Sequence, residues 1–289
     1  MTSAAASSRA GTAVWLLARL AIRIFYRVQR VRATLPDGPV LLVANHPNSL
    51  LDPALVQATA GRRIRFLAKS TLFQGHLLSP LIRRSGAIPV YRRIDPGTDV
   101  SRNEEMFAAV EAVLAQAAVV CLFPEGISHS TGRLEQLRSG AARIALSSSA
   151  NGVRVAIVPI GLNFDRLAVF RSRVTVAFGQ PFGCDDLVSA YQDNPQAAVR
   201  MLTMRIEECL RRLMIEADPR GDLRMVDRIY RLYSAARGVS RAEADRLQRR
   251  RIIAAGIERL RVNDPAQYRS IQDKVLGYDT SGARFGLRE

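Results

Sequence analysis

Cysteine is scarce in this chain of 289 residues. Only three occur, Cys121, Cys184 and Cys209, and they lie far apart with no C-x-x-C pair among them. An odd number of cysteines without paired spacing predicts neither a disulfide framework nor a zinc site. The pattern is typical of reduced thiols on the cytosolic side of a membrane.

An apolar run of membrane-spanning length is missing from the N-terminal region. The segment TAVWLLARLAIRIFYRVQRVR, residues 12–32, is interrupted by arginine from Arg19 onward. A spanning helix requires roughly 20 apolar residues, and each arginine near the bilayer centre costs about 2.5–3.5 kcal/mol. The apolar run is also short for a signal peptide, and no small-residue cleavage pattern follows it. The sequence therefore predicts neither a spanning helix nor a cleaved leader in this segment.

Acidic residues are few compared with basic ones. The chain has 26 Asp and Glu against 42 Lys and Arg, a formal net charge of +16, and Lys69 and Lys274 are its only lysines. Such a surface attracts nucleic acid, anionic lipid headgroups, a phosphate-bearing substrate or an acidic carrier protein. No zinc-finger spacing, aromatic RNP-like strand or heptad with a basic region is present. We therefore expect no specific nucleic-acid partner, and a non-enzymatic protein that binds membrane or nucleic acid stays an alternative.

The arginines of residues 12–32 favour a lipid surface as the polyanion. Four of them share one helical face: Arg19, Arg23, Arg27 and Arg30. The opposite face is apolar and consists of Val14, Leu17, Ala21, Ile24, Phe25 and Val28. A basic amphipathic helix lies in the membrane interface, where each arginine near an anionic surface adds about 1 kcal/mol. We interpret residues 1–34 as a helix at the cytoplasmic face of a membrane. The alternative is a helix that packs its apolar face on the protein.

The rest of the chain has the composition of a folded globular protein, with 48% hydrophobic and 24% charged residues. Six short apolar runs read as strands, at residues 39–45, 63–69, 86–92, 118–126, 154–163 and 172–182. Residues 101–117 and 132–150 have helical periodicity. This alternation predicts an α/β domain over residues 35–190, with a central parallel or mixed sheet flanked by helices. Residues 191–289 are predicted to form a helical C-terminal extension.

Histidine is another scarce residue, with His46, His76 and His129 as its three occurrences. His46 follows an apolar run in VANHPNSLLDP, and Pro47 biases it toward an extended conformation. Asn48 is a turn former, and Asp52 before Pro53 reads as the N-cap of a helix. An ionised Asp52 fixes the imidazole tautomer and leaves the other ring nitrogen to accept a proton from a hydroxyl. The alternative is that His46 bonds the backbone and Asp52 only caps the helix.

The order of four short blocks, NHPNSLLDP, GAIPVYR, FPEGISHS and VPIGLNF, resembles the glycerolipid acyltransferase family. That family transfers fatty acyl groups from coenzyme A or acyl carrier protein to glycerol-phosphate acceptors. The resemblance covers residues 39–182. The segments LRSGAARIAL, VFRSRVTVAFGQPF and RIYRLY are similar to the branch that contains the glycerol-3-phosphate acyltransferases of fungi.

The resemblance implies a direct transfer without a protein nucleophile. His46 deprotonates the acceptor hydroxyl, Asp52 orients the imidazole, and the alkoxide attacks the thioester, with no metal or bound organic cofactor. Glu125 accepts from glycerol hydroxyls and Gly126 admits backbone N–H groups to phosphate, whereas the alternative for Glu125 is a buried structural carboxylate. The full set of implied substrate-binding residues is Gly86, Arg92, Phe123, Pro124, Glu125, Gly126, Pro159, Arg171 and Arg173.

The sequence departs from the family in two places. Five residues, 47–51, separate the histidine from the aspartate where the family usually has four, and the fungal-type branch shares this longer spacing. The third block usually ends in Thr-Arg, but Ile127 and Ser128 stand there. The acceptor-phosphate contact of that arginine therefore has no counterpart at Ser128. The arginines that remain as alternatives are Arg92, Arg138, Arg171 and Arg173, although each is as readily a solvated surface charge.

The sequence leaves other functions open. The segment GISHS, residues 126–130, suggests a serine acyl hydrolase, but it lacks the final glycine of G-x-S-x-G and follows a poor nucleophile elbow. Within the acyltransferase interpretation, glycerol-3-phosphate is the favoured acceptor. The runner-up is 1-acylglycerol-3-phosphate, and other lysolipids are further alternatives.

Overall fold

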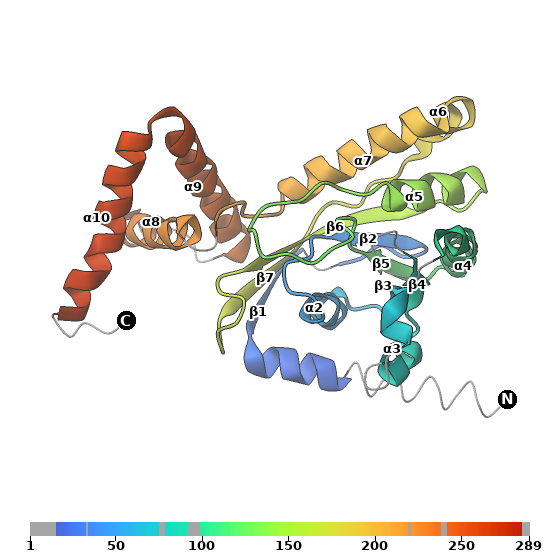
Figure 1. The fold of residues 1–289 in the computed structure, drawn as a ribbon, viewed down its shortest axis with the longest axis horizontal. Coiled ribbons are helices and arrows are strands. Elements are labelled where there is room, and N and C mark those ends of the chain that lie inside the picture. The colour runs from blue at the N-terminus through green and yellow to red at the C-terminus, as the bar shows by residue number, and fades with distance from the viewer. Residues whose placement is uncertain are drawn as a thin grey trace. The chain divides into compact units, whose positions relative to one another are not determined.

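The structure is a computed structural model, and it describes residues 16–32, 34–74, 79–91, 99–218, 221–237 and 242–284 (Figure 1). The chain divides into two compact units. The first consists of Met1–Ser128 and Glu135–Leu213, and the second of His129–Leu134 and Met214–Glu289.

The first unit is built on a seven-stranded mixed sheet with the order β1-β7-β6-β2-β5-β3-β4. The strands are β1 (Arg27–Val31), β2 (Val40–Ala44), β3 (Ile64–Lys69), β4 (Ile88–Val90), β5 (Val119–Leu122), β6 (Ala156–Phe164) and β7 (Arg173–Phe178). Every neighbouring pair is parallel except β6 and β7, which are antiparallel. The predicted α/β fold with a mixed sheet is confirmed, and all six predicted strands form.

The central strand β2 sets the position of the loops that follow the sheet. All five of its residues are buried, as expected of a continuous apolar run in a strand covered on both faces. Leu42 is in register with Cys121 of β5 and with Val158 of β6. Because these three strands are parallel, their carboxyl ends meet at one edge of the sheet. The loops after β2 and β5 therefore lie together.

Helices cover both faces of the sheet in the first unit (Figure 1). On one face lie α5 (Gly140–Ala150) and α7 (Pro195–Arg211), and on the other lie α2 (Leu51–Ala60) and a helix of residues 16–25. The remaining helices of the unit are α3 (Ser79–Ser85), α4 (Asn103–Ala115), α6 (Val188–Asp193) and the short 3₁₀ helices η1 (Ser70–Phe73), η2 (Val100–Arg102) and η3 (Asp185–Leu187).

Two predicted helices are shorter than expected. The N-terminal helix ends at residue 25, and Arg27 and Arg30, predicted on its basic face, lie in β1 instead. The segment RVQRV forms the edge strand β1 and pairs with β7, and this long-range pairing outweighs its helical periodicity. In residues 132–150 the helix begins only at Gly140, because the backbone before it bonds elsewhere: Arg138 N–H donates to the Pro124 carbonyl oxygen. Residues 1–15 lie outside the described part of the chain.

The second unit is helical, as predicted for the C-terminal region. Its helices are α8 (Asp222–Arg237), α9 (Glu243–Asn263) and α10 (Pro265–Arg284). They enclose a small apolar core of Ala217, Met225, Val226, Ala254 and Ile257. Over the residues that the structure describes, no helix of either unit has the length and apolar character needed to cross a bilayer.

Candidate active site

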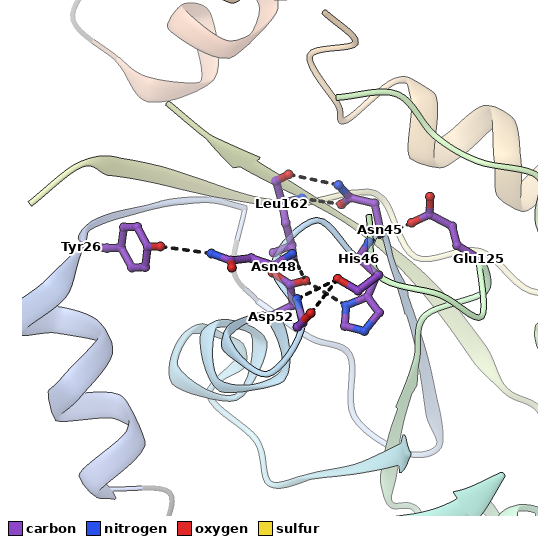
Figure 2. A network of polar contacts seen from close by, with 9 residues as sticks. Tyr26, Asn45, His46, Asn48, Asp52, Glu125 and Leu162 are labelled. Atoms are coloured by element: carbon purple, nitrogen blue, oxygen red, sulfur yellow. Dashed lines mark hydrogen bonds and ion pairs between the residues drawn. The ribbon is translucent and has the colours of Figure 1, made fainter. Parts of the chain in front are cut away.

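The candidate site begins where β2 ends. The side-chain amide of Asn45 donates to the Leu162 carbonyl at 3.1 Å, and its oxygen accepts the Leu162 N–H at 2.7 Å. This two-sided contact fixes the end of β2 to the neighbouring strand β6. His46 is the next residue, so its side chain stands at the carboxyl edge of the sheet (Figure 2).

His46 and Asp52 are in direct contact. The Nδ1 atom of His46 lies 2.8 Å from Oδ2 of Asp52, and the exposed fractions of the two side chains are 18% and 0%. An ionised carboxylate can only accept a hydrogen bond, so it favours the proton on Nδ1 of His46. A neutral imidazole held in this way keeps the lone pair on Nε2 that a general base requires.

A tight turn brings the two side chains together. Ser49 has a φ of +45°, and Leu51 N–H donates to the Asn48 carbonyl at 3.0 Å. Asp52 is not the N-cap that the sequence predicted, because α2 begins at Leu51. Its Oδ2 reaches back across the turn to accept the Asn48 N–H at 2.7 Å, as well as the imidazole.

Burial dominates the electrostatics of Asp52. Removal from water raises the pKa of its carboxyl, and the charge of Glu125 adds to that effect, while the hydrogen bonds from His46 and Asn48 oppose it. Its second oxygen, Oδ1, is buried and has no hydrogen-bond partner among the residues that the structure describes. A buried carboxylate with one orphan oxygen costs stability, which is common at sites that use the charge in a reaction.

Residues after β5 support the imidazole from the other side. The ring of Phe123 stacks on that of His46 with a centroid separation of 4.1 Å and an angle of 15°. Glu125 is 2% exposed; its Oε1 accepts the His46 N–H at 2.8 Å and its Oε2 accepts the Glu135 N–H at 2.9 Å. Both carboxylate oxygens thus bind main chain, as in the structural alternative for Glu125. Figure 2 shows Glu125 beside His46.

Ser128 takes part in the turn beside the pair. Its hydroxyl oxygen accepts the Ser49 N–H at 2.9 Å and lies 3.1 Å from the Ser49 hydroxyl. The serine that stands at the family's arginine position therefore ties the third block to the turn after His46. These contacts give Ser128 a structural role, and they do not supply the histidine partner of a serine nucleophile.

Arg138 is the arginine that borders the third block. Its N–H donates to the Pro124 carbonyl at 2.7 Å, and its exposed side chain passes beside Gly126. Gly126 has a φ of +72°, and a Cβ built there would lie 3.4 Å from Cγ of Arg138. Among the arginines that the sequence offered as replacements, Arg138 thus lies next to the loop that carries Glu125.

The other predicted substrate-binding residues lie elsewhere, and Arg92 falls outside the described residues. Gly86 has a φ of +77° and ends α3, at the edge strand β4. Pro159 is buried inside β6, beneath Gly179. Arg171 and Arg173 lie at the start of β7, where Arg173 is in register with Arg27 of β1. Within the described ranges, no hydrogen bond joins Gly86, Pro159 or Arg171 to the His46–Asp52 pair.

The sequence did not single out Tyr26 as a site residue. Its side chain is buried, its hydroxyl donates to the Leu167 carbonyl, and it accepts from the Asn48 side chain at 3.1 Å (Figure 2). Asn48 in turn donates its N–H to Asp52. No sequence signal links Tyr26 to a turn 22 positions later, because the contact exists only once β1 joins the sheet.

The sheet, the buried pair at the end of its central strand and the supporting loop after β5 make up the α/β domain that carries the candidate site. Residues 25–163, just under half of the chain, match the family model described as Acyltransferase.

Curated proteins are similar to this chain in sequence. The chain is 32% identical over 134 residues to Glycerol-3-phosphate O-acyltransferase 2 of Saccharomyces cerevisiae, across 45% of this chain and 18% of that protein. It is 34% identical over 125 residues to Glycerol-3-phosphate O-acyltransferase 1 of the same yeast, across 42% of this chain and 16% of that protein. The matches thus span less than a fifth of either yeast protein. An uncharacterized acyltransferase of Schizosaccharomyces pombe is 22% identical, across 96% of this chain and 54% of that protein.

A solved structure is also similar. The 1-acyl-sn-glycerophosphate acyltransferase PlsC from Thermotoga maritima has 17% sequence identity and a TM-score of 0.45, and the match covers 68% of this chain and 78% of that one.

Proposed function

We propose that this protein transfers a fatty acyl group from acyl-CoA or acyl carrier protein to the hydroxyl of glycerol-3-phosphate. The observation that carries the proposal is the 2.8 Å contact between Nδ1 of His46 and the buried carboxylate of Asp52. This contact leaves Nε2 as a base at the open edge of the sheet. The names of the two yeast relatives support glycerol-3-phosphate as the acceptor.

The proposed reaction is a single displacement. Nε2 of His46 takes the proton of the acceptor hydroxyl as the hydroxyl oxygen attacks the thioester carbonyl carbon. The new carbon–oxygen ester bond forms, the carbon–sulfur bond breaks, and the imidazolium returns its proton to the leaving thiolate. Asp52 stabilises the imidazolium, and base catalysis of this kind contributes about 10²–10⁴-fold. The chain supplies this chemistry with its own side chains.

We assign the acceptor phosphate to Arg138. Its side chain lies beside Gly126, in the loop that also carries Glu125, and Glu125 holds the His46 backbone. A guanidinium group binds phosphate through two parallel hydrogen bonds, which a lone serine cannot provide. Arg138 thus replaces the arginine that Ser128 displaced from the third block. We expect its substitution by glutamine to raise KM for the acceptor more than it lowers kcat.

Association with an anionic membrane at its cytoplasmic face is the second part of the proposal. The helix of residues 16–25 exposes large apolar side chains, with Leu17, Leu20 and Ile24 exposed at 67%, 56% and 54%. Arg19 and Arg23 are exposed on the same helix. Exposed apolar groups beside arginines suit the boundary between headgroups and acyl chains. The acyl donor and the acylated product both contain lipid chains, so a membrane surface is the natural place for the reaction.

The purified protein with labelled acyl-CoA and each acceptor in turn tests the substrate assignment. The products from glycerol-3-phosphate, 1-acylglycerol-3-phosphate and a lysolipid without a free phosphate monoester are separated by thin-layer chromatography. We expect the largest kcat/KM with glycerol-3-phosphate, and transfer retained by Ser128→Ala. A preference for a lysolipid overturns the acceptor assignment, and loss of transfer in Ser128→Ala with unchanged thermal unfolding favours a serine nucleophile.

A further inference from the structure

A second cationic site lies away from the Arg138 loop. A cavity of about 330 Å³ opens between the helix of residues 16–25, β1 and α2 in the first unit. Four arginines line it, Arg23, Arg27, Arg30 and Arg171, and none of the described residues that line it is acidic. We call it the arginine cavity. Tyr26 and Thr59, both buried, also line it.

The fold gathers these arginines from distant parts of the chain. Arg23 is in the last turns of the N-terminal helix, Arg27 and Arg30 are in β1, and Arg171 precedes β7. The Arg171 N–H donates to the Phe25 carbonyl at 2.5 Å, and β1 pairs with β7 along its whole length. The backbone therefore holds the four side chains around one opening, although about 150 positions separate the first from the last.

Among the residues that the structure describes, no carboxylate pairs with the charges of the cavity. All four arginines are exposed. A side-chain hydrogen bond within the group is long and therefore weak: Nη1 of Arg171 donates to the Arg23 carbonyl at 3.4 Å. Four like charges around one opening repel each other, and an anion between them relieves that repulsion.

The two neutral hydroxyl groups that line the cavity already form hydrogen bonds within the protein. The Tyr26 hydroxyl bonds Leu167 and Asn48, and the Thr59 hydroxyl donates to the Leu55 carbonyl at 2.7 Å. Recognition therefore falls to the guanidinium groups, whose planar forks match phosphate oxygens. We propose that the arginine cavity is a phosphate-binding site, which takes the phosphate of a soluble ester or of a phospholipid headgroup.

The cavity adjoins the candidate active site through Tyr26. Tyr26 lines the cavity, and its hydroxyl accepts from Asn48, whose N–H donates to Asp52. Because β1 runs antiparallel to β2, the start of β1 lies at the same edge of the sheet as His46. The cavity thus begins at the edge where the proposed transfer takes place. Phosphate binding is itself independent of acyl transfer, so the two proposals fail separately.

Calorimetric titration of the purified protein with inorganic phosphate at low salt tests the site. The double variant Arg27→Gln/Arg30→Gln removes two of its charges, and Arg65→Gln/Arg143→Gln removes two exposed charges elsewhere in the same unit. We expect the first variant to weaken phosphate binding by about tenfold or more and the second to change it by less than about twofold. Equal weakening in both, or none in the first, overturns the proposal.

The same proteins distinguish the two sources of phosphate. Binding to phosphatidylcholine vesicles with and without phosphatidylglycerol reports the headgroup, and titration with glycerol-3-phosphate reports the soluble ester. If Arg27→Gln/Arg30→Gln loses vesicle binding or glycerol-3-phosphate binding while the control variant keeps it, the result supports the site and identifies its ligand. Retention of both at the level of the control variant contradicts it.

Two further variants separate the roles of charge, fold and catalysis. Arg27→Lys/Arg30→Lys keeps the charge and loses the planar fork, so we expect an intermediate phosphate affinity. All four arginines are exposed, and the thermal unfolding midpoints of these variants are expected to match the wild type. His46→Ala is expected to lose acyl transfer and to bind inorganic phosphate normally. Loss of phosphate binding in His46→Ala places the anion at the catalytic edge instead and contradicts the assignment to the cavity.

Discussion

Asp52 shows how one buried residue links stability to the proposed chemistry. Its carboxylate is fully buried, one oxygen bonds His46 and the Asn48 backbone, and the other has no partner among the described residues. Fold stability alone favours a neutral group in such a position. In the proposed function the carboxylate has a role, because it orients the imidazole and stabilises its cationic form.

Asp52→Asn is expected to increase stability at neutral pH. Burial raises the pKa of Asp52, so the folded state binds this proton more tightly than the unfolded state does. The contribution of this proton to the stability of the fold is therefore complete below the ordinary aspartate pKa. It is lost as the pH rises through the pKa that Asp52 has in the folded state. Asparagine keeps the shape and one acceptor without the charge.

Thermal unfolding of both proteins across the pH range checks this expectation. The variant is predicted to unfold at a higher temperature than the wild type near neutral pH, and the difference is predicted to shrink toward about pH 4. A variant that is less stable at neutral pH, or a difference that does not depend on pH, contradicts this account of Asp52.

Tyr26→Phe tests whether the residue behind the turn positions the pair. The change removes the hydroxyl that bonds Asn48 and Leu167, and these two groups keep only their long 3.4 Å hydrogen bond to each other, at a cost of about 1–3 kcal/mol. Because Tyr26 acts through Asn48 and Asp52, we expect kcat to fall while KM for both substrates changes little. Tyr191→Phe in α6 is the matched control. A change in KM with kcat intact would assign Tyr26 to substrate binding instead.

The contact between His46 and Asp52 was predictable from the sequence because it is local. Pro47, the turn former Asn48 and Pro53 restrict the backbone within eight positions, and the pair can meet only through a turn. The bond between Glu125 and the His46 backbone spans 79 positions. It depends on β2 and β5 being neighbours in the sheet, which residue spacing does not encode.

Among the elements, the close contact between β6 and the residues just after α7 explains why β6 contains Gly161 and Asn163. A Cβ built on Gly161 would lie 2.4 Å from the Leu213 carbonyl oxygen, just after α7 ends. On the same strand, Asn163 donates its side-chain N–H to that oxygen at 2.9 Å. Gly161 permits the close approach and Asn163 satisfies the carbonyl that it exposes.

Gly161→Ala is expected to destabilise the first unit by about 1–3 kcal/mol, because the added methyl group meets backbone that cannot rotate away. Gly140→Ala is the control: it opens α5 with no atom within 4 Å of the built Cβ, and alanine favours a helix. The midpoints of thermal unfolding measure both. Equal midpoints for the two variants would show that α7 does not pack closely on β6.

Most strands were predictable from the sequence, whereas β1 was not. A run such as VLLVA in β2 is apolar at every position, which is typical of a central parallel strand. The segment RVQRV has two arginines and one glutamine, and its hydrophobic spacing also fits a helix. Its pairing with β7, about 145 residues later, decides the structure.

For the molecule as a whole, the net charge of +16 and the exposed apolar side chains of residues 16–25 point to the same kind of surface. Charge draws the protein to anionic lipid, and apolar side chains hold it there. Each feature by itself also occurs in proteins that bind no lipid. The helix of residues 16–25 combines exposed apolar side chains with Arg19 and Arg23. This combination predicts membrane binding that requires anionic lipid and weakens with salt.

Ile24→Asp is expected to reduce binding to phosphatidylglycerol vesicles without loss of stability. Ile24 is 54% exposed, so its packing contribution is small, whereas an aspartate there removes an apolar contact with lipid and repels the anionic surface. Met204→Asp in α7, at a side chain that is 69% exposed, is the control. A flotation assay measures both, and equal binding of the two variants argues against the helix as the lipid contact.

The central claim is that His46 acts as the base in a direct transfer, and the rate of acyl transfer by His46→Ala tests it most directly. The account predicts that kcat with glycerol-3-phosphate and acyl-CoA falls by about 10²–10⁴-fold, with thermal unfolding unchanged. A folded His46→Ala protein that transfers within a few-fold of the wild-type rate would contradict it.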